Sequence, residues 1–379
     1  MNLGTDKGPD KAATTLQRLK GLIQRHPKKL LIFILLLIAY YFCLPKQLFR
    51  TPHATVVESR SGKLLGALIA EDGQWRFPVV DSVPYKFETC ILNFEDAHFY
   101  WHPGFNPISI GKAFLANILA GKTVRGGSTL TQQVIRLSRN HKKRTYWEKV
   151  RELVLATRLE LGYSKKYILK LYASHAPFGG NVVGLEAAAW RYFGMQPNQL
   201  SWAEAATLAV LPNAPSLIYP GKNHSKLLYK RNRLLHKLLD NNYIDSTTYR
   251  LSLLEELPKK PFQLPDTAPH LVQYLAKKYK GKRISTHVDE NLQGSINNII
   301  NKHYKSLKQN QVYNAAVLLM DVKTREVLSY VGNTPTDNEH EKDVDMVQAN
   351  RSTGSVLKPL LYTAMMNAGE LLPGMLVPD

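Results

Sequence analysis

Residues 125–136 read RGGSTLTQQVIR, a stretch that combines two glycines with a dense set of hydroxyl and amide side chains. Ser128 and Thr129 are residue types that cap helices, so the stretch predicts a turn that opens into a helix. The free backbone N–H groups of a helix start suit an anion such as a pyrophosphate. Arg125 and Arg136 add positive charge at the two ends. An ordinary Gly-Gly-Ser turn is the alternative, and it stays open at this point.

A second polar cluster lies earlier in the chain, where residues 95–106 read EDAHFYWHPGFN. Glu95 and Asp96 are adjacent acids beside aromatic and histidine side chains. A carboxylate next to aromatic rings is partly desolvated, which favours its neutral form and raises its basicity. Glycosyl transfer needs such a carboxylate to take the proton from an attacking hydroxyl. The alternative is a solvated acid pair at a helix end.

The composition limits the class of partner. The chain has 379 residues, enough for two domains of ordinary size. Its 50 Lys and Arg residues and 30 Asp and Glu residues give a formal net charge of +20. Such a charge favours a nucleic acid, an anionic membrane surface or a phosphate-bearing substrate. The two cysteines, Cys43 and Cys90, form no C-x-x-C pair, so thiolate zinc sites are excluded and no intrachain disulfide is expected.

An unbroken apolar run at residues 30–44, LLIFILLLIAYYFCL, predicts a single transmembrane helix over residues 30–49. The basic segment 1–29 is expected to remain in the cytoplasm as a flexible tail. A cleaved signal peptide is the alternative, but no small-x-small cleavage site follows the run. The rest of the chain is then expected on the periplasmic or extracellular side, which argues against a nucleic-acid partner.

Beyond the apolar run, the pattern predicts an α+β chain with a largely helical body. Short strands are expected at residues 54–58 and 64–68, and helices from Pro84 to about Arg250. Asn106 before Pro107 is a helix-start signal, as is the pair Ser201 and Glu204.

The proline-rich stretch after Leu257 is interpreted as a linker, and two apolar strands at residues 315–320 and 327–331 follow it. The predicted limits are 50–256 for a first domain, 257–282 for the linker and 283–379 for a second domain.

The two polar clusters resemble the signatures E-D-x-x-F-x-x-H-x-G and G-G-S-T-L-T-Q-Q of the transglycosylase family (glycosyltransferase family 51) of bifunctional, class A penicillin-binding proteins. A third family motif, R-K-x-x-E, is similar to residues 148–152. The fourth and fifth motifs are similar to residues 166–194 and 211–216. The resemblance covers roughly residues 54–379, and the 1C subgroup is the most similar.

This resemblance implies a lysozyme-like, mainly helical peptidoglycan glycosyltransferase domain. Such an enzyme polymerises lipid II into glycan strands at the outer face of the cytoplasmic membrane, inverts the anomeric carbon and releases undecaprenyl pyrophosphate. Glu95 matches the general base, and Glu152 matches a second acid near the leaving group. The residues that match supporting or substrate-binding groups are Asp96, Phe99, His102, Ser128, Thr129, Gln133, Arg136, Lys149 and Lys166.

Two motifs depart from the family pattern: the third at Glu148, and the fourth at Lys170 and at Tyr172-Ala173-Ser174, where many members have Tyr-Leu-Asn. Glu148 replaces the first basic residue of the third motif, so one phosphate contact is predicted to be missing. Lys170 stands where many members have a glutamate. The glutamate of the other members is then only structural, or Lys170 contacts an anion, or activity is reduced. A solvated position on a helix surface is the alternative without a function. Glu152 taken alone is a helix-surface acid paired with a lysine.

Residues 355–358 form an S-x-x-K sequence that resembles the nucleophile motif of penicillin-binding transpeptidases. Ser355 would be the acyl nucleophile and Lys358 its activator. No S-x-N and no K-T-G sequence follows before Asp379. We therefore expect residues 283–379 to form only the start of an α+β transpeptidase domain, whose nucleophile does not function.

The resemblance also predicts partners. They are lipid II, the nascent glycan chain, the membrane and other cell-wall synthesis proteins, without nucleic acid. Some family members place a divalent ion on the pyrophosphate, and Asp96 is then the candidate ligand for Mg²⁺ or Mn²⁺. Apolar positions between the two clusters are candidates for bilayer contact, with core packing as the alternative: Ile108, Ile110, Phe114, Leu115, Ile118 and Leu119.

Two other functions remain open. A lysozyme-like glycan hydrolase also uses a glutamate in a helical cleft, but it needs no pyrophosphate site. A non-catalytic, membrane-anchored cell-wall scaffold is the other alternative, and the departures at Glu148 and Lys170 are compatible with it.

Overall fold

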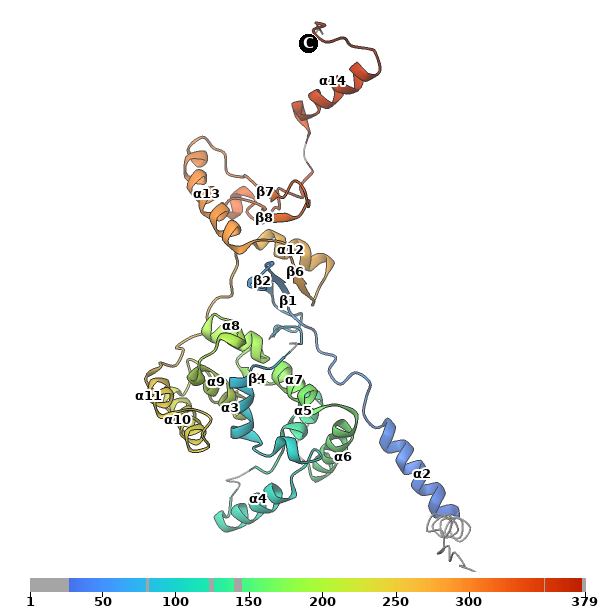
Figure 1. Ribbon diagram of the computed structural model, residues 1–379, viewed down its shortest axis with the longest axis vertical. Coiled ribbons are helices and arrows are strands. Elements are labelled where there is room, and N and C mark those ends of the chain that lie inside the picture. Colours follow the sequence, from blue (N-terminus) through green and yellow to red (C-terminus); the bar gives the residue numbers. More distant parts are fainter. Residues whose placement is uncertain (1–26, 80–81, 123–125, 140–144, 351, 377–379) are drawn as a thin grey trace, which may run out of the picture. The chain divides into compact units, whose positions relative to one another are not determined.

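The computed structural model describes residues 27–79, 82–122, 126–139, 145–350 and 352–376 (Figure 1). Most of the predicted basic tail, residues 1–26, and Arg125 lie outside the described residues. The chain divides into two units, each made of several segments. Unit 1 takes its described residues from Met1–Val56, Ala67–Pro265 and Lys278–Ile284, and unit 2 from Val57–Gly66, Asp266–Lys277 and Ser285–Asp379.

The predicted membrane segment contains helix α2 (Pro27–Phe42), which has 16 residues. None of the helices in the described part of the chain combines the length and apolar character that a membrane span requires. The end of α2 packs on helix α6 (Tyr146–Gly162). There the Tyr40 hydroxyl donates to Thr157 at 3.0 Å, and the Arg158 guanidinium lies 4.7 Å from the centre of the Tyr41 ring.

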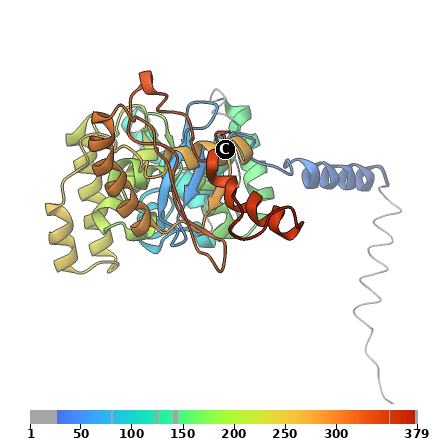
Figure 2. The same cartoon turned by 90° about the horizontal axis from the view of Figure 1, so that it is seen from above.

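Unit 1 is mostly helical. Helix α9 packs against α3, α8, α10 and α11, and α5 packs against α6 and α7. Figure 2 shows α10 and α11, in yellow, side by side. Buried alanines on α9 allow its neighbours to approach closely. The bounds are α3 (Tyr85–Glu95), α4 (Pro107–Ala120), α5 (Leu130–Ser138), α7 (Lys165–His175), α8 (Leu185–Phe193), α9 (Trp202–Val210), α10 (His224–Asp240) and α11 (Ser246–Leu254).

Several helices start where the sequence predicts. The Asn106 side chain accepts the Ser109 N–H at the start of α4, and Thr129 accepts the Gln132 N–H at the start of α5. Ser201 and Glu204 form a reciprocal capping box at the start of α9. These capping interactions confirm the predicted helix starts. The sequence could predict them because each depends on neighbouring residues alone.

Short strands complete the α+β fold. Strands β1 (Thr55–Glu58), β2 (Leu64–Leu68) and β6 (Arg283–Ser285) form a sheet in the order β2-β1-β6. A second small sheet has the order β3-β5-β4, in which β3 (Trp75–Arg76) runs parallel to β5 (Val182–Val183), and β4 (Pro177–Gly179) runs antiparallel to it with an irregular register.

In unit 2, β7 (Val317–Met320) and β8 (Val327–Val331) form an antiparallel hairpin, with Leu318 opposite Tyr330. Helix α13 (Glu290–Gln309) packs on β8, and the fully buried Gln293 amide oxygen accepts the Ser329 hydroxyl and the Tyr330 N–H.

Helix α12 (Pro269–Lys278) falls inside the segment predicted as a linker. Three of its residues, His270, Leu271 and Val272, are buried. The predicted domain limits otherwise remain predictions. Predicting an α+β, mostly helical chain was right, and the strands predicted at residues 54–58, 64–68, 315–320 and 327–331 match β1, β2, β7 and β8.

Both ends of α8 are glycines with positive φ, but their surroundings differ. Gly184 precedes the helix with φ +89, and a Cβ atom there would lie 2.8 Å from the Ser174 carbonyl oxygen. Gly194 follows it with φ +69, and a Cβ atom there would meet nothing within 4 Å. The backbone conformation favours glycine at both positions. Only at Gly184 would a side chain also collide with a neighbouring segment.

These two positions give a matched test of that difference. Gly194→Ala should lower the free energy of unfolding by about 1–2 kcal/mol, because it forces alanine into the left-handed region. Gly184→Ala should cost about 1–3 kcal/mol more, because its backbone (φ +89, ψ +146) is nearly closed to alanine and the Ser174 backbone must also move. Urea unfolding of both variants measures the difference, and equal effects would show that the close approach to Ser174 does not constrain the fold.

Candidate active site

Glu95 is the last residue of α3 and lies against α5. Its Oε2 accepts a hydrogen bond of 2.8 Å from the Gln133 amide. Its Oε1 is buried and makes no hydrogen bond within the described residues. Burial raises the pKa of Glu95 above its ordinary value, while the Gln133 hydrogen bond and the Arg136 charge partly offset that rise. The carboxylate is therefore a strengthened base with one oxygen left to accept a proton.

Three residues beside Glu95 were not identified from the sequence as site residues. Asn213, at the end of the short helix η3 (Leu211–Asn213), lies near enough to lower the pKa of Glu95 as a polar neighbour without a hydrogen bond of normal geometry to Oε1, and the charge of Lys230 of α10 also lowers it. Lys230 donates to the Asn213 side-chain oxygen at 2.7 Å. The Tyr172 hydroxyl of α7 is buried without a hydrogen-bond partner in the described residues, and burial and the Glu95 charge raise its pKa. Asn213 and Tyr172 lie in matched motifs, but no sequence signal marks Lys230.

Asp96 joins the end of α3 to the start of α5. Its Oδ2 accepts the Leu130 backbone N–H at 3.0 Å and the His102 Nε2–H at 2.9 Å. The Gly104 N–H donates to His102 Nδ1 at 3.2 Å, which assigns the ring proton to Nε2. Asp96 and His102 are both buried.

The surroundings of Asp96 also test the predicted divalent ion. Its second oxygen, Oδ1, lies 3.1 Å from His102 Nε2, so both carboxylate oxygens are occupied by protein groups. Within the described ranges, no cluster of three or more His, Cys, Asp or Glu side chains is arranged to hold a metal. Asp96 as a ligand for Mg²⁺ or Mn²⁺, and the involvement of a divalent ion, stay predictions.

The loop after Asp96 is fixed by a lysine. Phe99 is buried, and the Lys165 ammonium lies 4.5 Å from the centre of its ring. Lys165 also donates to the His102 carbonyl and to Glu160, each at 2.7 Å. Glu160 in turn accepts the Thr131 hydroxyl at 2.5 Å. These contacts connect the loop with α5, α6 and α7.

The sequence had assigned Lys166 rather than Lys165 to the site. Lys166 is exposed, and its side chain makes no hydrogen bond or ion pair among the residues that the structure describes. A substrate contact by Lys166 stays a prediction. The helical pattern alone does not show which of two adjacent lysines is directed toward the site, because the orientation of α7 depends on its packing.

In the predicted anion-binding stretch, the hydroxyls of Thr129 and Ser128 have different partners. The Thr129 hydroxyl donates to the Gly104 carbonyl at 2.7 Å and caps α5, so it serves the fold. The Ser128 hydroxyl instead accepts a hydrogen bond of 2.7 Å from Lys149. Gly104 itself has φ +93, and a Cβ atom there would lie 2.8 Å from the Ala156 carbonyl oxygen of α6.

A cavity of about 610 Å³ lies beside this stretch. Lys149 donates to Gln132 at 2.8 Å and to the buried Glu152 at 3.1 Å, as well as to Ser128. The Arg136 side chain makes no hydrogen bond or ion pair within the described ranges, although it lowers the pKa of Glu95. We call this the cationic cavity; its lining includes Ser128, Arg136, Arg139, Thr145, Tyr146, Glu148, Lys149 and Glu152.

The two departures from the family pattern have different surroundings. Glu148 accepts hydrogen bonds from Arg139, with Nη2 at 2.9 Å and Nε at 3.1 Å from Oε2. Arg151 approaches the other oxygen of Glu148 at 3.4 Å. Lys170 is half-buried, and its side chain makes no hydrogen bond or ion pair with any described residue.

The S-x-x-K residues lie in unit 2. Ser355 belongs to the short helix η5 (Gly354–Leu357), and Lys358 begins α14 (Lys358–Asn367). Both side chains are exposed and neither makes a hydrogen bond or ion pair in the part of the chain that is described. The role of Ser355 and its expected lack of function stay predictions.

The adjacent lysines allow a direct check of the loop contacts. Lys165→Ala should lower the free energy of unfolding by about 1–3 kcal/mol, because it removes charged hydrogen bonds to His102 and Glu160. Lys166→Ala, as the matched control, should change it by less than about 0.5 kcal/mol. Thermal or urea unfolding measures both, and a neutral Lys165→Ala would mean that this lysine does not hold the loop.

Comparisons with known proteins show what the chain is similar to. The family model for transglycosylases matches residues 61–239. Penicillin-binding protein 1C of Escherichia coli is 35% identical over 88% of this chain and 43% of its own length. Penicillin-binding protein 1B of Haemophilus influenzae is 30% identical over 83% of this chain and 43% of its own length.

The solved structure of Haemophilus influenzae penicillin-binding protein 1A matches 72% of this chain and 32% of its own with 20% identity and a TM-score of 0.31. The chain thus spans less than half the length of the two curated relatives named above. Residues 61–239 therefore match the transglycosylase family, and the chain is similar to penicillin-binding proteins 1C and 1B.

Proposed function

We propose that the chain is a peptidoglycan glycosyltransferase that polymerises lipid II, with inversion at the anomeric carbon and release of undecaprenyl pyrophosphate. The observation that carries this proposal is the pairing of a strengthened base with a cationic cavity. Glu95 has a buried, unpaired Oε1, and Arg136 both acts on Glu95 and lines the cavity. The transglycosylase domain supports the same reaction class.

In this mechanism, Glu95 takes the proton from the 4-hydroxyl of the acceptor sugar. The Gln133 amide holds Oε2, which leaves Oε1 for the incoming hydroxyl. The acceptor oxygen forms a bond to C1 of the donor as the bond from C1 to the pyrophosphate oxygen breaks. Glu95 retains the proton until it passes to solvent, and the pyrophosphate leaves with the bonding electron pair.

The cationic cavity would receive the leaving pyrophosphate. Arg136 is available for it, because the described residues offer its side chain no other partner. Lys149 is oriented toward the same cavity by Ser128, Gln132 and Glu152. Preorganised cations of this kind stabilise the negative charge that develops on the leaving group. Glu152 would then be an orienting acid, since its carboxylate is bound to Lys149.

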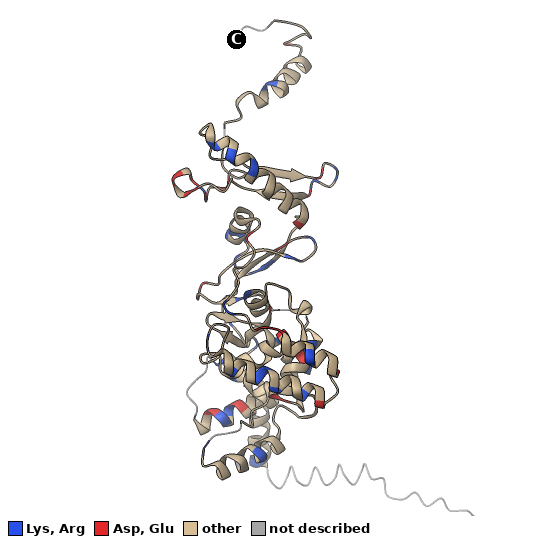
Figure 3. Ribbon diagram, turned by 90° about the vertical axis from the view of Figure 1, so that its left-hand side faces the viewer, with Lys and Arg blue, Asp and Glu red and all other residues tan. Residues whose placement is uncertain are grey.

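Membrane attachment is part of the proposal, because the substrate carries a lipid. We propose a single-pass chain whose N-terminus is cytoplasmic and whose domain faces the outer side of the cytoplasmic membrane. The exposed apolar residues of α2 and α4 support it; on α4 they include Ile108, Leu115, Ile118 and Leu119. Figure 3 shows lysine and arginine positions on many elements of the ribbon, and the formal net charge of +20 favours attraction to anionic lipid. Nascent glycan and other cell-wall synthesis proteins are the proposed partners.

The first test replaces the base with its amide. Glu95→Gln should reduce turnover of lipid II by about 10²–10⁴-fold while leaving the melting temperature near that of the wild type, because it removes general-base catalysis alone. Gel analysis of the polymer, together with released undecaprenyl pyrophosphate, measures the reaction. Unchanged polymerisation by this variant would disprove the mechanism. For the wild-type chain, shortening of mature glycan would instead indicate a hydrolase, and binding without either reaction would indicate a scaffold.

The second test uses the pH dependence. Glu95 is active as the carboxylate, so activity is present above its pKa and is lost as the pH falls through it. Gln133→Leu and Arg136→Gln each remove a group that lowers this pKa. Both should therefore move the acid limb of kcat/KM to higher pH, whereas Arg250→Gln, an exposed control on α11, should not. An acid limb that stays in place in both variants would show that Glu95 does not control it.

A further inference from the structure

The replacement of a basic residue by Glu148 is accompanied by an unusual ion pair. Arg139 directly follows α5, and Glu148 lies in the first turn of α6. Their closest atoms, Nη2 and Oε2, are 2.9 Å apart, and the two side chains are only 24% and 18% exposed. A bidentate, largely buried pair of this kind fixes the plane of the guanidinium.

Only one edge of the Arg139 guanidinium is used. Nε and Nη2 donate to Glu148, whereas Nη1 makes no hydrogen bond within the described residues. A guanidinium has five N–H donors in a fixed plane, so a second edge remains that could bind two oxygens of another anion.

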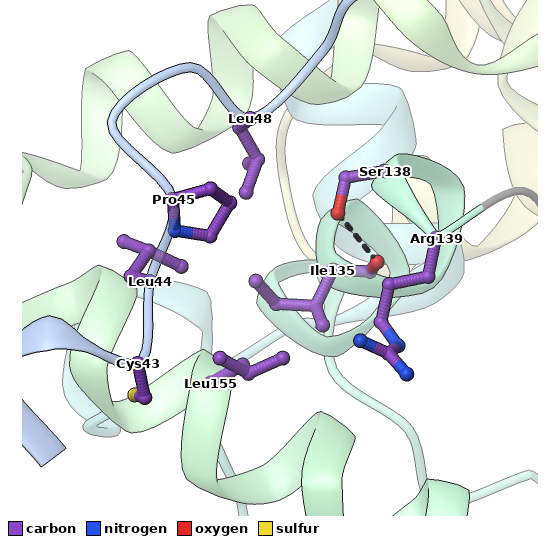
Figure 4. Close-up of a pocket in the computed structure, with 8 residues that line it drawn as sticks. All are labelled: Cys43, Leu44, Pro45, Leu48, Ile135, Ser138, Arg139 and Leu155. Atoms are coloured by element: carbon purple, nitrogen blue, oxygen red, sulfur yellow. Dashed lines mark hydrogen bonds between the residues drawn. The ribbon is translucent and has the colours of Figure 1, made fainter. Parts of the chain in front are cut away.

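The surroundings of Arg139 limit where that second partner can be. Arg139 lines the cationic cavity and also an apolar cavity of about 330 Å³ (Figure 4). In the apolar cavity, Ser138 already donates its hydroxyl to the Ile135 carbonyl at 2.7 Å. The other lining residues are Cys43, Leu44, Pro45, Leu48, Ile135 and Leu155. None of these other lining residues is charged, whereas Arg136 and Lys149 line the cationic cavity beside Arg139, so an anion in the cationic cavity is the favourable partner.

We propose that Arg139, positioned by Glu148, binds the pyrophosphate of the donor in the cationic cavity. Relatives have a basic residue at the position of Glu148. In this chain, Arg139 at the end of α5 supplies the positive charge instead, and Glu148 orients it. Arg139 is the binding residue and Glu148 the positioning residue. This inference rests on the proposed function for the identity of the donor, and its test uses a ligand that requires no catalysis.

The primary experiment is calorimetric binding of inorganic pyrophosphate, without divalent ions, to the purified full chain. Arg139→Lys keeps a positive charge beside Glu148 but loses the second N–H edge. It should weaken pyrophosphate binding by about tenfold to a hundredfold, the value of charged hydrogen bonds, with an unchanged melting temperature. Arg233→Lys, an exposed control on α10, should bind like the wild type. Equal binding by Arg139→Lys and the wild type would overturn the proposal, as would a wild-type chain that binds no pyrophosphate.

A second variant tests the positioning role. Glu148→Gln removes a negative charge from the cavity lining, which on charge alone would tighten pyrophosphate binding. Because the amide no longer fixes the guanidinium, we expect binding to weaken instead by about threefold to tenfold. With lipid II as substrate, KM should rise more than kcat falls. Tighter binding by Glu148→Gln would show that the pair is only structural. If pyrophosphate binding depends on Arg139 but no polymer forms, the site stands and the proposed function fails.

Discussion

The carboxylate of Asp96 holds the elements of the site together. It accepts the first backbone N–H of α5 and the ring N–H of His102, so the end of α3, the following loop and the start of α5 meet at one buried group. A negative charge at a helix start is stabilised by the unpaired N–H groups and the helix dipole. Glu95 is the neighbouring residue, and its position against Gln133 of α5 follows from this junction. An uncompensated Asp96 would be costly in that interior, so its partners fix the local geometry as well as its charge.

The sequence predicted the parts of the site that depend on local pattern. The helix starts at Asn106, Thr129 and Ser201 follow from capping chemistry, and β1, β2, β7 and β8 follow from apolar runs between turns. Motif resemblance then brought Glu95, Gln133 and Arg136 into one hypothesis, and the structure places Gln133 directly on Glu95. Their catalytic roles remain predictions.

Other residues could not be found in this way, because they reach the site through tertiary packing. Lys230 is one of several lysines on α10, and nothing in its neighbours shows that α10 faces Glu95. Lys165 and Lys166 are equivalent in sequence, but only Lys165 enters the buried network. The hydroxyl of Thr129 was expected near the pyrophosphate, yet the capping interaction and the Gly104 carbonyl occupy it.

The unpaired Oε1 of Glu95 has a consequence for inhibitor chemistry. A buried acceptor without a donor carries a desolvation cost of about 1–3 kcal/mol, which any molecule that supplies an N–H or O–H there would recover. Arg136 lies close enough to act on the same carboxylate and also lines the cationic cavity. A compact molecule that joins a hydrogen-bond donor to an anionic group would thus bind Oε1 of Glu95 and Arg136 at the same time. Its selectivity would come from polarity rather than from apolar contact area, and it would not depend on a lipid tail.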